Sequence, residues 1–171
     1  MANGRRNGQR GSTILEFTLV GIPLIFALIS IFEIARGMWL YHTLEYAVTE
    51  GTRYATVHGV DCTLPGNTCS VAIKDIAGVI QYAGAGLLPD QLTLTFTPNR
   101  INAAITCTLQ NCLKNATAWP PANDNLAGMD VTISGTYPFA SAIAMFWPGS
   151  GAAAVFPTFN LPATSKERIQ F

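Results

Sequence analysis

The sequence predicts an α+β protein in which a long N-terminal transmembrane helix continues into an exported domain with a short helix and a small antiparallel sheet. Three observations support this fold class. An uncharged apolar stretch lies near the N-terminus. Apolar and small residues then recur at helical spacing, and beyond residue 90 apolar and polar residues alternate as in half-buried strands.

The apolar stretch follows a basic leader. The first ten residues carry no acid and three arginines, which are Arg5, Arg6 and Arg10. Residues 17–32 carry no charge, and the wider segment 14–35 adds one acid near each end. A helix of about 20 mostly apolar residues crosses the hydrocarbon core of a bilayer, so residues 14–35 are predicted to form the span. Basic flanks favour the cytoplasm, which predicts an internal N-terminus and an exported remainder.

A removable secretory signal peptide is the alternative to a retained span. Its apolar region usually has about 7–15 residues and is followed by a small-x-small cleavage site. The run in this chain is longer, and Ala35-Arg36-Gly37 is a poor cleavage site. The sequence therefore favours a span that stays in the protein.

The composition argues against a nucleic-acid partner. Hydrophobic residues make up 49% of the chain and charged residues only 12%, whereas soluble domains carry about 25% charged residues. Acidic and basic residues balance at ten each. Beyond residue 59 there are five basic and six acidic residues, so the exported part lacks the basic patch that binds nucleic acid.

The span is predicted to continue as one helix over residues 12–58, after a leader of residues 1–11. Beyond the span a narrow stripe recurs at spacings of three and four, formed by Leu40, Leu44, Ala47, Gly51 and Ala55. This stripe needs a partner, either the chain's own sheet or neighbouring subunits. His58-Gly59 is the expected end of the helix, with glycine supplying a left-handed cap.

Several side chains of this helix have two interpretations. Pro23 removes one helix hydrogen bond, which predicts either a simple kink or local melting needed for subunit packing. Glu33 and Arg36 lie three positions apart, so they form either a surface ion pair or an assembly contact. Trp39 and Tyr41 are expected to be aromatic anchors at the membrane interface.

Residues 59–171 are predicted to form the exported α+β domain. A short helix is expected from Val71 to about Tyr82, capped by Ser70, with a buried face of Ile73, Ile76, Ala77 and Ile80. Strands are expected at residues 92–97, 103–109 and 131–137, with a turn at 98–100 and a polar loop at 111–125. The apolar stretch 139–147 is too short to span a bilayer and is expected to pack on the sheet. Residues 149–154 read as a loop, and the tail 156–171 as an edge strand.

All four cysteines lie beyond the span, which agrees with export. They are Cys62, Cys69, Cys107 and Cys112. An even number in an oxidising compartment indicates two disulfides. The local pairings Cys62–Cys69 and Cys107–Cys112 are favoured among the three that four cysteines allow, because each closes a short polar loop. Zinc ligands usually sit as Cys-x2–4-Cys pairs, and the six-residue gap and missing histidine pair argue against zinc. No metal and no other cofactor is expected.

The run from Gly11 to Phe17 carries most of the functional information. A basic leader ends in glycine, and Glu16 follows five residues later inside the apolar run. An ionised carboxylate at the bilayer centre costs roughly 2.5–3.5 kcal/mol on insertion scales. Cleavage after Gly11 would expose a new amine at Ser12 that could neutralise Glu16. It would also remove the arginines that hold the helix at the inner leaflet. The alternative is that Glu16 is an interfacial acid paired with Arg10.

The Gly-x-x-x-x-Glu-Phe pattern after a basic leader resembles that of type IV prepilins, which a prepilin peptidase reads on the cytoplasmic face. More narrowly, four features together resemble the TadE-like family over residues 10–59, about a third of the chain: the run 10–17, Pro23, Glu33-Ile34-Ala35-Arg36, and Glu50-Gly51-Thr52-Arg53-Tyr54-Ala55. Pro23 lies one position later than the family pattern leads us to expect. The exported domain is similar only loosely, through residues 131–137 and 165–168.

The resemblance implies a minor pilin or pseudopilin of the tight-adherence (Flp, type IVc) pilus, which contributes to pilus assembly and surface adherence. It implies cleavage between Gly11 and Ser12, assembly contacts through Glu16 and Phe17, and a pilin-like exported domain. The implied partners are a prepilin peptidase, other pilin subunits, the Tad assembly platform and the bacterial inner membrane. The domain would then be periplasmic, with a route into an extracellular pilus.

Two other function classes compete with a pilin. A stably anchored periplasmic scaffold or binding domain would keep its leader. An anchored enzyme would need a constellation of polar residues. The only histidines, His42 and His58, both lie on the predicted long helix, with no placed Asp or nucleophile beside them. The sequence therefore predicts a structural protein and not an enzyme.

Overall fold

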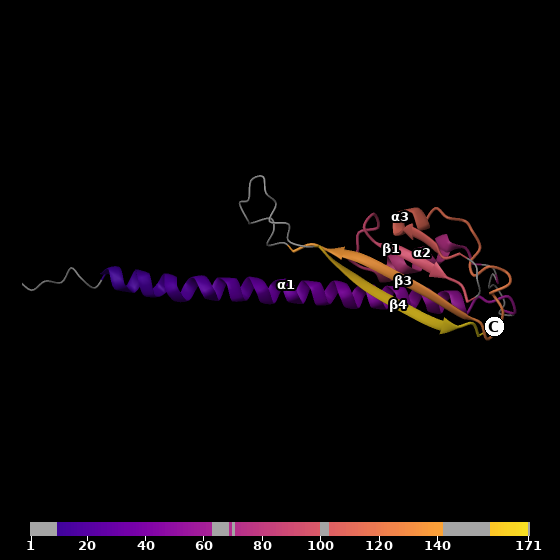
Figure 1. Ribbon diagram of the computed structural model, residues 1–171, viewed down its shortest axis with the longest axis horizontal. Helices are drawn as coiled ribbons and strands as arrows, with labels where there is room; N and C mark the ends of the chain where they lie inside the picture. Colours follow the sequence, from indigo (N-terminus) through magenta and orange to yellow (C-terminus); the bar gives the residue numbers. More distant parts are fainter. Residues whose placement is uncertain (1–9, 63–68, 70, 100–102, 142–157, 171) are drawn as a thin grey trace, which may run out of the picture.

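The computed structural model describes residues 10–62, 69, 71–99, 103–141 and 158–170. The elements in chain order are α1 (Arg10–Thr56), α2 (Ile73–Ala83), β1 (Thr93–Thr97), β2 (Ile105–Thr108), α3 (Leu109–Cys112), β3 (Asp130–Phe139) and β4 (Phe159–Arg168). In Figure 1 the N-terminal part of α1 projects as a rod, and its C-terminal part carries the sheet and the short helices. The predicted α+β class is confirmed.

The sheet has four strands in the order β2-β1-β3-β4, and all neighbouring strands are antiparallel. The tail of the chain forms an edge strand, as expected. The longest pairing joins β3 to β4, from Asp130 opposite Arg168 to Phe139 opposite Phe159. Figure 1 shows this hairpin lying along α1, with its Phe139 end toward the projecting part of the helix.

Alternation in the strands sends one set of side chains into the core. Leu94 and Phe96 of β1 are fully buried, while the threonines beside them are not. Their partners on β3 across the ladder are Gly135 and Ile133, which continue the same face. This buried face packs against the outer part of α1, because Gly135 lies directly beneath α1 side chains.

The predicted stripe of α1 is buried, and its partner is the chain's own domain. Its members Leu44, Ala47 and Ala55 have no exposed surface. Two glycines permit the close approach. A Cβ on Gly51 would lie 2.5 Å from Cγ1 of Ile80 on α2. A Cβ on Gly135 would lie 2.9 Å from Cγ2 of Val48. Both distances are shorter than real Cβ contacts, so a side chain at either position would force its neighbours to move.

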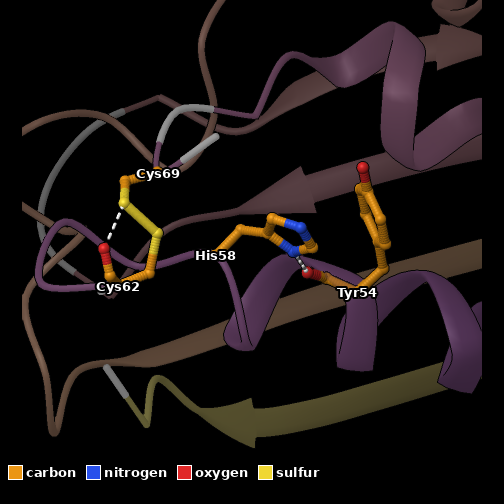
Figure 2. Close-up of a disulfide and its surroundings, with 4 residues drawn as sticks. All are labelled: Tyr54, His58, Cys62 and Cys69. Carbon is orange, nitrogen blue, oxygen red and sulfur yellow. Dashed lines mark hydrogen bonds between the residues drawn. A yellow bond between two sulfur atoms is a disulfide. The ribbon is translucent and has the colours of Figure 1, made fainter. Parts of the chain in front are cut away.

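Helix α1 ends at Thr56, two residues before the expected end. The four terminal carbonyls of a helix need partners outside the regular ladder. Arg53 O accepts from the Val57 N–H, and Thr56 O accepts from the Gln170 N–H, both at 3.2 Å. The His58 N–H donates to Ala55 O at 3.4 Å. His58 Nδ1 donates to Tyr54 O at 2.6 Å, as Figure 2 shows. The capping side chain is therefore His58.

The predicted start of the short helix and the predicted range of the second strand were wrong. Helix α2 begins at Ile73 with Ala72 as its N-cap, not Ser70, and the Ala72 N–H donates to Asp75 Oδ2 at 3.0 Å. The second strand covers only Ile105–Thr108, because α3 begins at Leu109. The Cys107–Cys112 disulfide explains this end, since its Cα atoms lie 5.6 Å apart. An extended strand would separate them by roughly 16 Å.

The stretch predicted as a polar loop contributes to the core. Trp119 is buried, and its ring packs edge-on against Phe96 with the centroids 5.3 Å apart. Ala118 bridges to Ala72, which fastens this stretch to the start of α2. Ser70, part of the predicted turn at 98–100, and most of the stretches 139–147 and 149–154 lie outside the described residues.

Ion pairs gather at the end of the sheet opposite Phe139. Asp130 Oδ2 lies 3.1 Å from Lys166 Nζ, and Asp130 Oδ1 lies 3.2 Å from Arg168 Nε. Hydrogen bonds from these two cations hold the pKa of the Asp130 carboxyl below its ordinary value. Arg53 joins α1 to β4 here through Glu167 at 3.6 Å. These pairs are exposed, so each contributes little to stability.

We expect Gly51→Ala to destabilise the domain. The added methyl group would overpack the contact with Ile80, at a cost of about 1–3 kcal/mol, offset in part by the helix propensity of alanine, about 1 kcal/mol. Gly78→Ala in α2 is the matched control, because its Cβ would meet nothing within 4 Å. Thermal unfolding in detergent, followed by near-UV circular dichroism, should show a lower midpoint for Gly51→Ala only. Equal shifts would contradict the close approach.

Candidate functional site

The N-terminal part of α1 is apolar on every side. Between residues 13 and 32 every residue except the half-buried Gly21 is exposed in the described chain. The exposed fraction of the large apolar side chains reaches 77% at Phe17. A helix that is hydrophobic all round requires apolar surroundings. The helix is also long and apolar enough to cross a membrane, which indicates a single-pass membrane anchor.

Two hydroxyl groups on this surface form hydrogen bonds within the helix. Thr18 Oγ1 lies 3.1 Å from Ile14 O and 3.0 Å from Leu15 O. Ser30 Oγ donates to Phe26 O at 2.8 Å. These bonds to carbonyls of the preceding turn satisfy the hydroxyl donors of Thr18 and Ser30. The helix also continues through Pro23 without a break, so the structure shows no local melting there.

The predicted cleavage and assembly residues lie at the start of this rod. The backbone of Gly11 and Ser12 is in the first turn of α1, which begins at Arg10 and so includes the end of the expected leader. Glu16 and Phe17 follow and are exposed. Ser12 and Glu16 are four positions apart, so they occupy one helix face about 6 Å apart along the axis.

A second constellation lies where the rod meets the domain. Glu33 is 9% exposed, and its Oε2 lies 3.3 Å from Arg36 Nη2. Arg36 Nη2 also donates to Ala140 O, and the guanidinium lies 4.5 Å from the centre of the Phe139 ring. The pair is thus more than a surface ion pair, because it fastens α1 to the end of β3. Sequence reasoning found Glu33 and Arg36 but missed Phe139 and Ala140, which are more than a hundred residues away.

The two disulfides join the pairs that the cysteine spacing favours. Cys62 is bonded to Cys69, and Cys107 to Cys112. Figure 2 shows the first disulfide beyond the end of α1, near His58 and Tyr54. His58 is occupied by capping the helix. Among the described residues, no group of three or more His, Cys, Asp or Glu side chains could hold a metal ion.

The comparisons with known proteins bear on α1. The family described as TadE-like protein has a model that matches residues 11–53, which is about a quarter of the chain. This match confirms the predicted TadE-like resemblance over that segment. The resemblance implies association with the Tad pilus system. No curated protein and no solved structure matches the chain significantly.

The matched segment ends in residues that dock the domain. Gly51 contacts α2 through Ile80, and Ala55, just beyond the match, is fully buried. Arg53 bridges Glu50 at 3.5 Å and Glu167 at 3.6 Å. The Glu-Gly-x-Arg-Tyr-Ala run therefore has a structural explanation inside one chain.

We expect Arg36→Gln to loosen the membrane-proximal end of the hairpin. It removes the cation–π contact with Phe139 and the charge-assisted bonds, together about 1–2 kcal/mol of local stability. Amide hydrogen exchange around Phe139 should then accelerate about 5- to 30-fold. Arg53→Gln loses only exposed ion pairs and should leave exchange at Phe139 unchanged. Unaltered exchange in Arg36→Gln would show that the contact does not hold the hairpin.

Proposed function

We propose that this protein is a TadE-like minor pilin or pseudopilin that contributes to assembly of a Tad (Flp, type IVc) pilus and to surface adherence. One observation carries the proposal. Within the TadE-like segment, an exposed apolar rod holds a single charged residue between positions 11 and 32, Glu16, one turn beyond Ser12. Such a rod with its acid beside a cleavable glycine suits insertion first into a bilayer and then into an assembly of similar helices.

The proposed topology places the N-terminus in the cytoplasm and the folded domain in the periplasm. The three arginines of the leader support an internal N-terminus. The two disulfides support an oxidising compartment for the domain. The rod would then cross the bacterial inner membrane once.

Processing would convert the anchored precursor into an assembly subunit. A prepilin peptidase would hydrolyse the bond between Gly11 and Ser12 and release the leader with its arginines. This bond lies in the first helical turn, whose N–H groups have no partners within the helix, so unwinding it for the peptidase costs little. The new Ser12 amine would then neutralise Glu16, on the same subunit or on a neighbour.

The docked domain supports a structural role. The outer part of α1 is joined to the sheet by its buried stripe and by the Arg36 contacts with Phe139 and Ala140. A displacement of the rod along the membrane normal would therefore carry the domain with it. In this proposal other pilin subunits contact the exposed surface around Phe17, and the Tad assembly platform moves the processed subunit.

Cleavage is the first test. Intact mass of the membrane-extracted protein, co-expressed with a prepilin peptidase, should show loss of residues 1–11. Gly11→Ala should block this loss, because the peptidase requires the glycine before the scissile bond, while membrane insertion continues. Gly21→Ala is a control inside the span, where a Cβ has room.

A full-length mature chain in the presence of active peptidase would contradict the proposal. It would favour the alternative of a stably anchored periplasmic scaffold or binding domain that keeps its leader. Loss of residues 1–11 from Gly11→Ala as well would show that the glycine does not direct cleavage.

Assembly through Glu16 is the second test. Glu16→Gln should leave cleavage intact but reduce incorporation into sheared pili or cross-linked pilin complexes about tenfold or more. The Ser12 amine would then lack its carboxylate partner, and an unmatched charge at membrane depth costs several kcal/mol. Glu45→Gln changes an exposed acid of α1 outside the span and should assemble normally. Normal incorporation of Glu16→Gln would remove the assembly role of this carboxylate.

A further inference from the structure

Charge is segregated along the β3–β4 hairpin. Its charged residues are Asp130 at the start of β3 and Lys166, Glu167 and Arg168 at the end of β4. These positions lie at one end, because Asp130 pairs with Arg168 across the ladder. Between residues 131 and 165 the sequence contains no charged residue. The opposite end of the hairpin is closed by the pair of Phe139 and Phe159.

The uncharged end lies beside α1 at the end of the predicted span. The Phe139 ring lies 4.5 Å from the Arg36 guanidinium, and a Cβ on Gly37 would lie 3.5 Å from its Cζ. From Ile14 to Glu33 a helix advances roughly 29 Å, which matches the hydrocarbon core of about 30 Å. With residues 14–33 in the hydrocarbon core, Phe139 would lie at the level of the headgroups, and the charged end of the hairpin lies farther along α1 (Figure 1).

An apolar groove of about 630 Å³ opens at this level between α1 and the hairpin. Its apolar walls are formed by Ile34, Met38, Tyr41, Phe139, Phe159 and Leu161. Ile34 is 67% exposed and Phe159 is 63% exposed, like the side chains of the span just below them. Arg36 adds no free cation to this wall, because Glu33 pairs with it.

We propose that this end of the hairpin is a second membrane-contact surface, which enters the headgroup layer of the outer leaflet and takes phospholipid acyl segments into the groove. Phospholipid is the expected occupant because the groove is continuous with the apolar surface of the span. The groove continues the exposed apolar surface of the span at a depth where phospholipid already surrounds the helix. The charged end of the hairpin remains in water. The domain is then held at two points, which limits its tilt about the rod.

Depth-dependent fluorescence quenching tests this contact. The full chain carries Trp39→Phe and Trp147→Phe, which leaves Trp119, 1% exposed, as a constant baseline. Phe159→Trp is the probe. Leu126→Trp is the matched control, because Leu126 is 42% exposed and lies near the distal end of α1, where the neighbouring Asn125 bonds to Val60. Both proteins are reconstituted into phosphatidylcholine vesicles with brominated acyl chains.

Quenching of Phe159→Trp should be at least about twofold stronger than that of Leu126→Trp, since interfacial apolar surfaces lie about 5–10 Å into the headgroup and acyl boundary. Equal quenching would overturn the proposal. Quenching that disappears as the protein-to-lipid ratio rises would also overturn it, because a second copy would then occupy the groove. The vesicles contain no peptidase, so these results do not depend on leader cleavage or pilus assembly.

Discussion

The contact between the outer part of α1 and the sheet is the constraint on which the rest of this structure depends. The two halves of α1 suit different environments, because the first half is apolar all round and the second half has one buried stripe. Helix α1 packs closely on the rest of the domain at two positions where glycine leaves room for a neighbouring side chain. These are Gly51, which faces Ile80, and Gly135, which faces Val48. Without this contact the domain would be a separate module on a tether. With it, the rod and the domain form one body.

This constraint changes how the family motif is understood. The TadE-like match covers residues 11–53, and its two ends have different roles in the structure. The N-terminal end presents Glu16 and Phe17 on an exposed apolar surface, as an assembly or membrane site requires. At the C-terminal end Gly51 packs on α2, and the exposed Arg53 forms an ion pair with Glu167 of β4. One motif therefore combines an exposed apolar surface with an intramolecular joint.

The joint continues to the membrane boundary. Arg36 contacts Glu33, the Phe139 ring and Ala140 O, so the end of the hairpin is held at the level where the span ends. The hairpin's own residues carry no charge at this end, and its charges gather around Asp130, where Lys166 and Arg168 lower the pKa of its carboxyl. The distribution matches a domain that stands on a bilayer with its charged end in water.

The sequence by itself determined the features set by local periodicity and spacing. These are the apolar span, the stripe of α1, the alternating strands, the local disulfide pairs and the Gly11-to-Glu16 motif. It placed Leu109 in a strand and Ser70 at a cap, because one-dimensional patterns do not show that the Cys107–Cys112 disulfide forces a turn or that Asp75 bonds the Ala72 N–H. Only the tertiary structure decided that the stripe packs on the chain's own sheet. It alone brought Phe139 to Arg36 and Trp119 to Phe96. Such contacts depend on the strand order and on the close approach of backbones, and both are set by residues that are distant in the sequence.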